Sequence, residues 1–196
     1  MSWHVPQRSH GRATVQSLDP RCSPASQVHG KWAGALAMRM GTGGLICREV
    51  MQRDGRRNML EKLVFTSAYN LVGAVHGGIT VGEVASKHKD EVGAMCRELA
   101  SFIRYTLSVS LFSGLDDRLA SYARHLEFLP TSLKEFEFRN GYFYRYSLMA
   151  GTRTTADGRK VEIPDTTPIH TEYLLFAVEN GIIPQELLDS VKPMGS

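Results

Sequence analysis

Lys62 and Asn70 are the residues whose types and spacing could do chemistry. They lie eight positions apart, close to two helical turns, so that together with Thr66 they share one side of a helix. Apolar residues at i, i+3, i+4 and i+7 fill the neighbouring stripe, which is typical of a helix facing a core. The pair is therefore either solvated or directed into a cleft between helices, where an ammonium could stabilise and protonate developing negative charge.

The elements that would position this pair are helices. The pattern predicts long helices over about 58–75, 89–110, 116–128, 133–149 and 168–179, a short turn or helix from 80, and a final short helix over 184–191. Thr131 or Ser132 would cap the helix over 133–149, and Thr167 the helix over 168–179. Strand signals are few, with a brief extended segment at 161–163. The predicted fold class is an all-α helical bundle.

The composition of the chain limits the classes of molecule that we expect it to bind. The chain has 196 residues, enough for one domain with a sizeable core, and a net charge of only +3 without a dense Lys/Arg run. We therefore expect neither nucleic acid nor a membrane as a partner. Three cysteines (Cys22, Cys47 and Cys96) lie far apart without metal-ligand spacing, which favours reduced thiols in a cytoplasmic protein, with no metal site. Cys47 and Cys96 lie among apolar residues and are expected to behave as small core residues.

The N-terminal part differs from the rest. Residues 1–30 are rich in Ser, Pro, Gln, His and Arg and carry a single acid, which predicts a disordered tail; an Arg- and Ser-rich transit peptide of a mitochondrial protein is the alternative. Residues 31–54 form a transition segment, in which 33–40 is either a short helix or a buried strand. The glycine cluster at 41–44 is interpreted as a flexible turn, because Ile46 stands where a dinucleotide fingerprint needs glycine.

Four short segments stand in a fixed order: Glu61-Lys62-Leu63 with Asn70, Val81-Gly82-Glu83, residues 131–141, and residues 167–175. They resemble, in turn, four motifs of the C-terminal domain of ketopantoate reductases: the Lys-Leu…Asn helix, the Asn-Gly-Glu turn, the Ser…Thr-Glu-Ile-Asp…Asn-Gly stretch and the closing Thr-Pro…Leu-Tyr-x-Leu-Leu helix. The resemblance covers about residues 55–190 and implies a helical domain over 55–192 of the kind found at the C-terminus of 6-phosphogluconate dehydrogenases.

The resemblance implies roles for four residues. Lys62 matches the general acid of the family and Glu135 the glutamate that orients the substrate, while Asn70 and Ser132 match substrate-binding positions. The implied reaction is transfer of a hydride from NADPH to the ketone of a small 2-keto acid, as in the reduction of 2-dehydropantoate to pantoate on the route to pantothenate. Hydride transfer leaves negative charge on the carbonyl oxygen, which a positioned ammonium can stabilise.

The chain also departs from the family pattern. Thr66 stands where the family has an asparagine, Val81 replaces the asparagine of the Asn-Gly-Glu turn, and residues 151–165 have no clear counterpart. Residues 1–54 are too short for a Rossmann domain. We therefore expect the C-terminal domain alone, inactive without a separate nucleotide-binding domain. The alternative is a non-enzymatic helical module that dimerises or docks through an aromatic face near Phe138 and Tyr142. Glu137, two residues after Glu135, is a rival for its role. His76 is expected to be a turn residue and His170 a surface residue.

Overall fold

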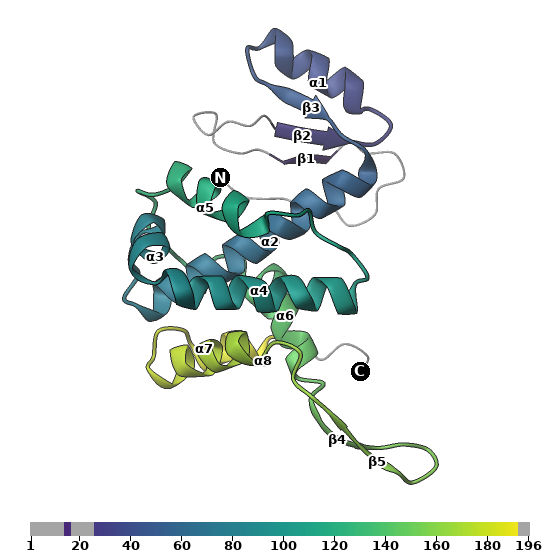
Figure 1. Ribbon diagram of the computed structural model, residues 1–196, viewed down its shortest axis with the longest axis vertical. Helices are drawn as coiled ribbons and strands as arrows, with labels where there is room; N and C mark the ends of the chain where they lie inside the picture. Colours follow the sequence, from purple (N-terminus) through teal and green to yellow (C-terminus); the bar gives the residue numbers. More distant parts are fainter. Residues whose placement is uncertain (1–13, 17–25, 192–196) are drawn as a thin grey trace. The chain divides into compact units, whose positions relative to one another are not determined.

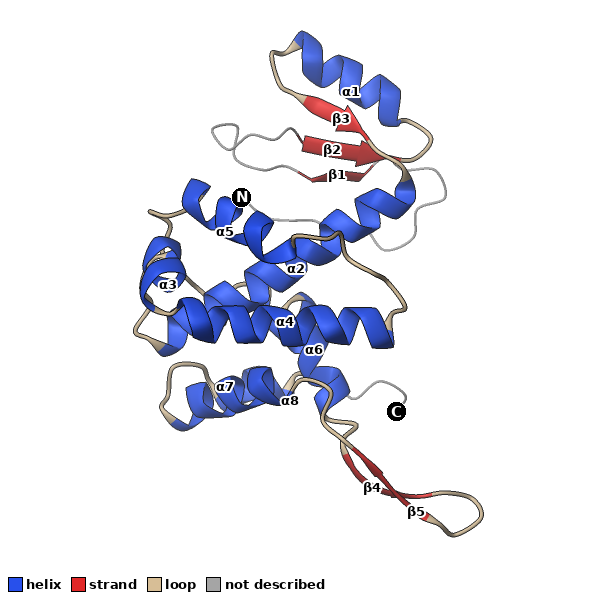
Figure 2. Cartoon of the chain, viewed as in Figure 1, coloured by secondary structure: helices blue, strands red, loops and turns tan. Residues whose placement is uncertain are grey.

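The computed structural model describes residues 14–16 and 26–191, in two compact units, Met1–Met59 and Leu60–Ser196 (Figures 1 and 2). Most of the described residues are helical, which agrees with the prediction of a mainly helical fold. The structure also contains two small sheets. The boundary between the units falls inside one long helix, α2 (Gln52–Val75).

The first unit contains a small three-stranded sheet. Its strands are β1 (Thr14–Gln16), β2 (Ser26–His29) and β3 (Cys47–Glu49), in the order β1-β2-β3. Strands β1 and β2 are antiparallel, whereas β2 and β3 are parallel with Ser26 opposite Cys47. A parallel pair requires a crossover, and α1 (Ala33–Thr42) provides it. Val28 and Ala33 are buried.

The first unit contains secondary structure in the N-terminal part, where the sequence predicted a disordered tail and a transition segment. Most of the predicted disordered tail, and Cys22 with it, lies outside the described residues; in the part that the structure does describe, β1 and β2 are formed. Residues 33–40, left open between helix and strand, belong to α1. The transition segment thus contains α1, β3 and the first residues of α2.

The second unit is built from helices. They are the greater part of α2, then α3 (Val81–Lys87), α4 (Lys89–Thr106), α5 (Leu115–His125), the 3-10 helix η1 (Phe136–Phe138), α6 (Asn140–Ser147), α7 (Pro168–Glu179) and α8 (Gln185–Asp189). The apolar stripes of α2 and α4 are buried as their periodicity predicts, Leu71 and Leu99 completely. Cys96 is buried in the same core, as expected, whereas Cys47 in β3 is only half-buried.

Most of the aromatic residues between 136 and 146, which include the predicted aromatic face near Phe138 and Tyr142, lie in or against this core. Tyr142 and Tyr146 pack edge-on against Phe102, with ring centroids 6.3 and 4.7 Å away, and Phe143 joins them at 5.3 Å. Only Phe138 of the cluster is largely exposed, at 63%. The aromatic residues therefore mainly hold α6 against α4.

The start of α7 is capped from another helix. Thr167, predicted to cap it, makes no side-chain cap bond; instead the carboxylate of Glu98 on α4 accepts hydrogen bonds from the backbone N–H groups of Ile169 and His170 at 2.8 and 2.9 Å. A carboxylate at a helix N-terminus satisfies unpaired donors and complements the helix dipole. Glu98 thereby fixes α7 to α4.

Two further sequence predictions in this unit are wrong. No helix spans 133–149: residues 131–135 are non-helical, and α6 begins only at Asn140 after the 3-10 turn, because Glu135 adopts a left-handed backbone with φ of 53°. His170 is not a surface residue but completely buried, with its Nε2 3.0 Å from Oδ1 of Asn140. Its partner lies 30 residues earlier in the chain, out of reach of local sequence patterns.

The segment 151–165 forms an exposed hairpin of β4 (Gly151–Thr154) and β5 (Lys160–Ile163) that extends away from the helices of its unit (Figure 1). At its base, Asp165 Oδ1 accepts hydrogen bonds from the Ser147 hydroxyl at 2.7 Å and from the Thr167 backbone N–H at 2.8 Å. The extended segment predicted at 161–163 is thus confirmed. Among the described helices, none combines the length and apolar character needed to cross a bilayer.

Gly73 in α2 allows a close crossing. A Cβ at Gly73 would lie 2.3 Å from Oγ1 of Thr131, so the segment at 131 can approach the helix only because the side chain is missing. We expect Gly73→Ala to lower the free energy of unfolding by about 1–3 kcal/mol through overpacking. Gly93→Ala is the control, because there a Cβ would meet only the flexible end of Arg97 at 3.2 Å, and a gain of up to about 1 kcal/mol is expected in a helix. Chemical denaturation measures both; equal effects would refute the crossing.

His170 makes stability sensitive to acid. Burial lowers its pKa from 6.5 to about 3, so between these values the unfolded chain binds a proton that the folded chain does not. The free energy of unfolding therefore falls as the pH drops from about 6.5, by at most about 1.4 kcal/mol per pH unit. In urea titrations between pH 6.5 and 5, His170→Gln should show a shallower slope than the wild type. His125→Gln, at an exposed position, controls for loss of an imidazole; an unchanged slope in His170→Gln would contradict the assignment.

Candidate functional site

Lys62 lies in the middle of α2, half-buried beside the apolar stripe. Burial is the main cause that lowers the pKa of its ammonium from 10.5 to about 8, the nearby Arg139 lowers it further, and Glu135 raises it. A lysine in this range holds its proton at neutral pH and releases it readily. This is the property that a proton donor to a carbonyl oxygen requires.

Glu135 is brought to Lys62 by an unusual backbone. Its φ of 53° is in the left-handed region, which costs a non-glycine residue about 1 kcal/mol or more. Its carboxylate forms a 2.9 Å ion pair with Arg139, and their side chains are 32% and 17% exposed. Glu135 and Arg139, which are far from Lys62 in the sequence, thus place a carboxylate and a guanidinium within electrostatic reach of its ammonium.

The segment that carries Glu135 is fastened to α2 by Asn70. The Oδ1 of Asn70 accepts a 3.0 Å hydrogen bond from the backbone N–H of Ser132, and its Nδ2 donates to the carbonyl of Thr66 at 2.7 Å. Next to it, the Thr131 hydroxyl donates to the carbonyl of Ile79 at 2.6 Å. The amide of Asn70 is therefore used within the protein, where it positions the loop before η1.

The Val81-Gly82-Glu83 motif serves the fold. Val81 is buried, and Glu83 and Thr80 form a reciprocal capping box at the start of α3, with bonds of 3.1 and 3.2 Å. A Cβ at Gly82 would lie 2.9 Å from Cβ of Glu127, so glycine permits this packing. The position that carries asparagine in the family's turn thus faces the core in this chain.

The predicted site residues therefore fall into two groups. Lys62 and Glu135 are brought together. Ser132 instead lines a cavity of about 440 Å³ with apolar residues around Ile183 and Leu187, and neither Lys62 nor Glu135 lines it. Arg139 was missed by the sequence analysis; its spacing of four residues from Glu135 was the available signal, obscured by the rival pairing of acids and bases in the same stretch.

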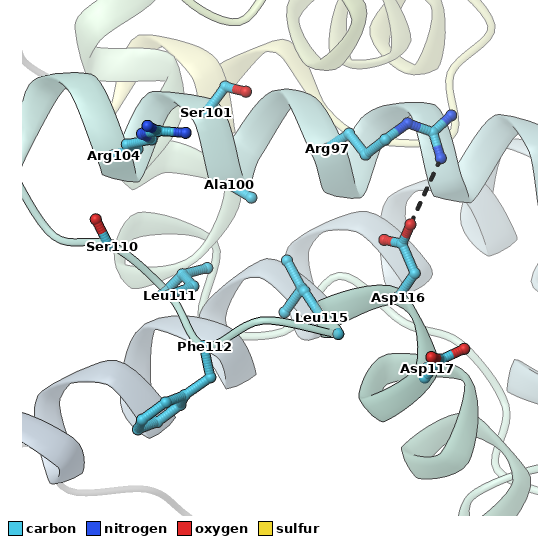
Figure 3. A pocket seen from close by; sticks show the side chains of 11 residues that line it. Arg97, Ala100, Ser101, Arg104, Ser110, Leu111, Phe112, Leu115, Asp116 and Asp117 are labelled. Carbon is cyan, nitrogen blue, oxygen red and sulfur yellow. Dashed lines mark ion pairs between the residues drawn. The ribbon is translucent and has the colours of Figure 1, made fainter.

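A second cavity, of about 620 Å³, lies between α4 and the segment leading into α5 (Figure 3). Arg97 and Arg104 line it from α4, and Asp116 and Asp117 from the start of α5, with Arg97 and Asp116 forming a weak 4.0 Å ion pair. Its charges are balanced, which favours no particular ligand. None of the predicted site residues lines it.

The wall of this cavity is tied to α2 next to Lys62. Glu61 is buried and binds Arg118 through both oxygens, at 2.6 and 3.0 Å, while Arg118 also donates to the carbonyl of Phe112 at 2.9 Å. This fork-like pairing is the strong geometry for an arginine and a carboxylate. Glu61 thus anchors the segment before α5, whereas its neighbour Lys62 meets Glu135 and Arg139.

The glycine cluster at 41–44 does not fit the phosphate turn of an NADPH site. A dinucleotide pyrophosphate is held by a glycine-rich turn at the N-terminus of a helix, where backbone N–H groups point outward. The glycine cluster at 41–44 lies instead at the C-terminal end of α1, where carbonyl groups and the negative end of the dipole are found. The interpretation of this cluster as a turn, rather than a phosphate loop, agrees with this placement.

Comparison of the chain with protein-family models, with curated proteins and with solved structures finds no match. A partly desolvated ammonium beside a carboxylate and a guanidinium can polarise a carbonyl or hold a small anion, and can give up a proton near neutral pH.

The two neighbours of Lys62 should shift its pKa in opposite directions. Glu135→Gln removes a charge that raises this pKa, so the value should fall below about 8, whereas Arg139→Gln removes a charge that lowers it, so the value should rise. Lys62 can be followed by the pH dependence of its acetylation, quantified by mass spectrometry, with the exposed Lys89 as internal reference. A shift of the same sign in both variants would show that the three side chains do not form one electrostatic cluster.

Proposed function

We propose that the second unit, Leu60–Ser196, is the carbonyl-binding domain of a 2-keto acid reductase of the ketopantoate type. The observation that carries the proposal is the half-buried lysine in the middle of α2, whose pKa burial lowers to about 8 and which lies within electrostatic reach of Glu135 and Arg139. The order of the four motifs from 61 to 175 supports the same class.

In this proposal Lys62 donates a hydrogen bond to the ketone oxygen and gives it a proton as negative charge develops there. The low pKa matters because a donor whose pKa lies near the ambient pH transfers its proton with little penalty. Glu135 accepts a hydrogen bond from a substrate hydroxyl and so fixes the reacting carbon. Arg139 positions Glu135, and Asn70 positions the segment that carries it.

The hydride would come from a nicotinamide, NADPH in the family that the chain resembles. Since the glycine cluster at 41–44 lies at the C-terminal end of α1, we propose that a nucleotide-binding domain separate from the second unit supplies it. The purified chain is then expected to bind a 2-keto acid without reducing it. The residues of this unit contribute binding, orientation and the proton.

The test is to measure the binding of 2-dehydropantoate to the purified chain by calorimetry and by NMR. We expect Lys62→Met and Glu135→Gln each to weaken binding by about 10- to 100-fold, which corresponds to the loss of one charge-assisted hydrogen bond of about 1.5–3 kcal/mol. Pyruvate, which lacks the hydroxyl, should distinguish the two: Lys62→Met weakens its binding, whereas Glu135→Gln does not.

Glu137→Gln is the matched control, because Glu137 lies two residues away, is 56% exposed on its side chain and pairs with Arg145 rather than with the site. It should bind 2-dehydropantoate like the wild type. The proposal fails if the wild type shows no binding, or if Lys62→Met binds as tightly as the wild type while remaining folded by circular dichroism.

A further inference from the structure

Two histidines and a glutamate meet at the end of α2. His76 follows the last residue of α2, His88 lies between α3 and α4, and Glu91 is in the first turn of α4. His76 Nε2 lies 2.7 Å from one oxygen of Glu91, and His88 Nδ1 lies 3.0 Å from the other. The ligand atoms of the three residues thus lie close together. His76 is in a turn, as the sequence predicted; the sequence analysis predicted no metal site.

The local fold makes this convergence possible. Gly77 and Gly78, both with positive φ, turn the chain sharply after His76. Helix α3 then leads back, so that His88 arrives beside His76 with the rings stacked, their centroids 3.6 Å apart and their planes 24° from parallel. Their nitrogens therefore face the same carboxylate.

The geometry is close to that of a metal site. One ligand atom from each of the three residues lies within 4.8 Å of the others. Tetrahedral ligands about 2.1 Å from Zn²⁺ stand roughly 3.4 Å apart, so shifts on the order of 1 Å would complete the coordination. Such shifts lie within the freedom of side chains that are 31%, 20% and 38% exposed.

A fourth side chain holds the carboxylate in place. The hydroxyl of Tyr173, on α7, donates a hydrogen bond to Oε2 of Glu91 at 2.7 Å. Partners of this kind, which orient a ligand from behind, commonly accompany metal-binding side chains. Tyr173 also adds α7 to the elements that meet at this cluster.

We propose that His76, His88 and Glu91 bind Zn²⁺, with water as the fourth ligand. Two imidazoles and a carboxylate, without a thiolate, suit zinc in a tetrahedral arrangement, and the partial exposure leaves room for the water. The ion would take the place of the hydrogen bonds between the two histidines and Glu91. It would connect the end of α2 to the start of α4 and, through Tyr173, to α7, and so stabilise the folded bundle by mass action.

The experiment titrates the purified full chain, treated with chelator, with Zn²⁺ against a chromophoric competitor, and with Co²⁺ as a spectroscopic probe. We expect one equivalent of tight binding, visible absorption bands of tetrahedral Co²⁺ and a higher melting temperature with zinc. His76→Gln, His88→Gln and Glu91→Gln should each weaken zinc binding by more than about 100-fold, and Tyr173→Phe by about tenfold, the range found for partners that orient a ligand.

His125→Gln is the control, since it removes an exposed histidine outside the cluster. The double variant His76→Gln/His88→Gln gives the background from the remaining histidines, including those of residues 1–13. Wild-type binding no tighter than this background would overturn the proposal. If a ligand variant does not fold, Tyr173→Phe still decides the matter, because unchanged zinc affinity in that folded variant would place the metal elsewhere.

Discussion

The close crossing of the segment at 131–135 over α2 is the constraint on which the candidate site depends. Gly73 leaves the space for Thr131. Asn70, one turn before Gly73 on the same helix, accepts a hydrogen bond from the backbone N–H of Ser132. Only with the chain fixed at these two points does Glu135, three residues later, reach the neighbourhood of Lys62. The site is therefore a property of one helix face and of the loop that lies across it.

The same helix lines the core and carries Lys62, and this explains the lowered pKa of Lys62. Its neighbours on α2 are buried in the bundle, so the ammonium is drawn out of water far enough to lose part of its hydration. Glu61, one position earlier, uses its charge for a fully engaged pair with Arg118. Adjacent residues thus differ in their electrostatic surroundings: the charge of Glu61 is paired with Arg118, whereas the pKa of Lys62 is lowered by burial.

The sequence predicted correctly the features that depend on local patterns of residues. The stripes of α2 and α4, the glycine end of α2, the proline at the start of α7 and the extended residues of β5 follow from periodicity and turn chemistry. It failed where a distant residue decides: the left-handed backbone of Glu135, the burial of His170 against Asn140 and the capping of α7 by Glu98 depend on partners 30 or more residues away or on the crossing over α2. Lys62 was predicted as a site residue from the order of the four motifs, whereas the ion pair of Arg139 with Glu135 could be recognised only once the loop was placed.

The hairpin of β4 and β5 has a consequence for how this chain can change over time. Its strands are almost wholly exposed, and its base is closed by Asp165 together with Ser147 and Thr167. Because these hydrogen bonds hold the end of α6 to the start of α7, a change in the length of the hairpin does not shift the helices of the bundle. The tip at 155–159 is thus a place where insertions, deletions or a grafted epitope can accumulate while the helices that carry Lys62 keep their register.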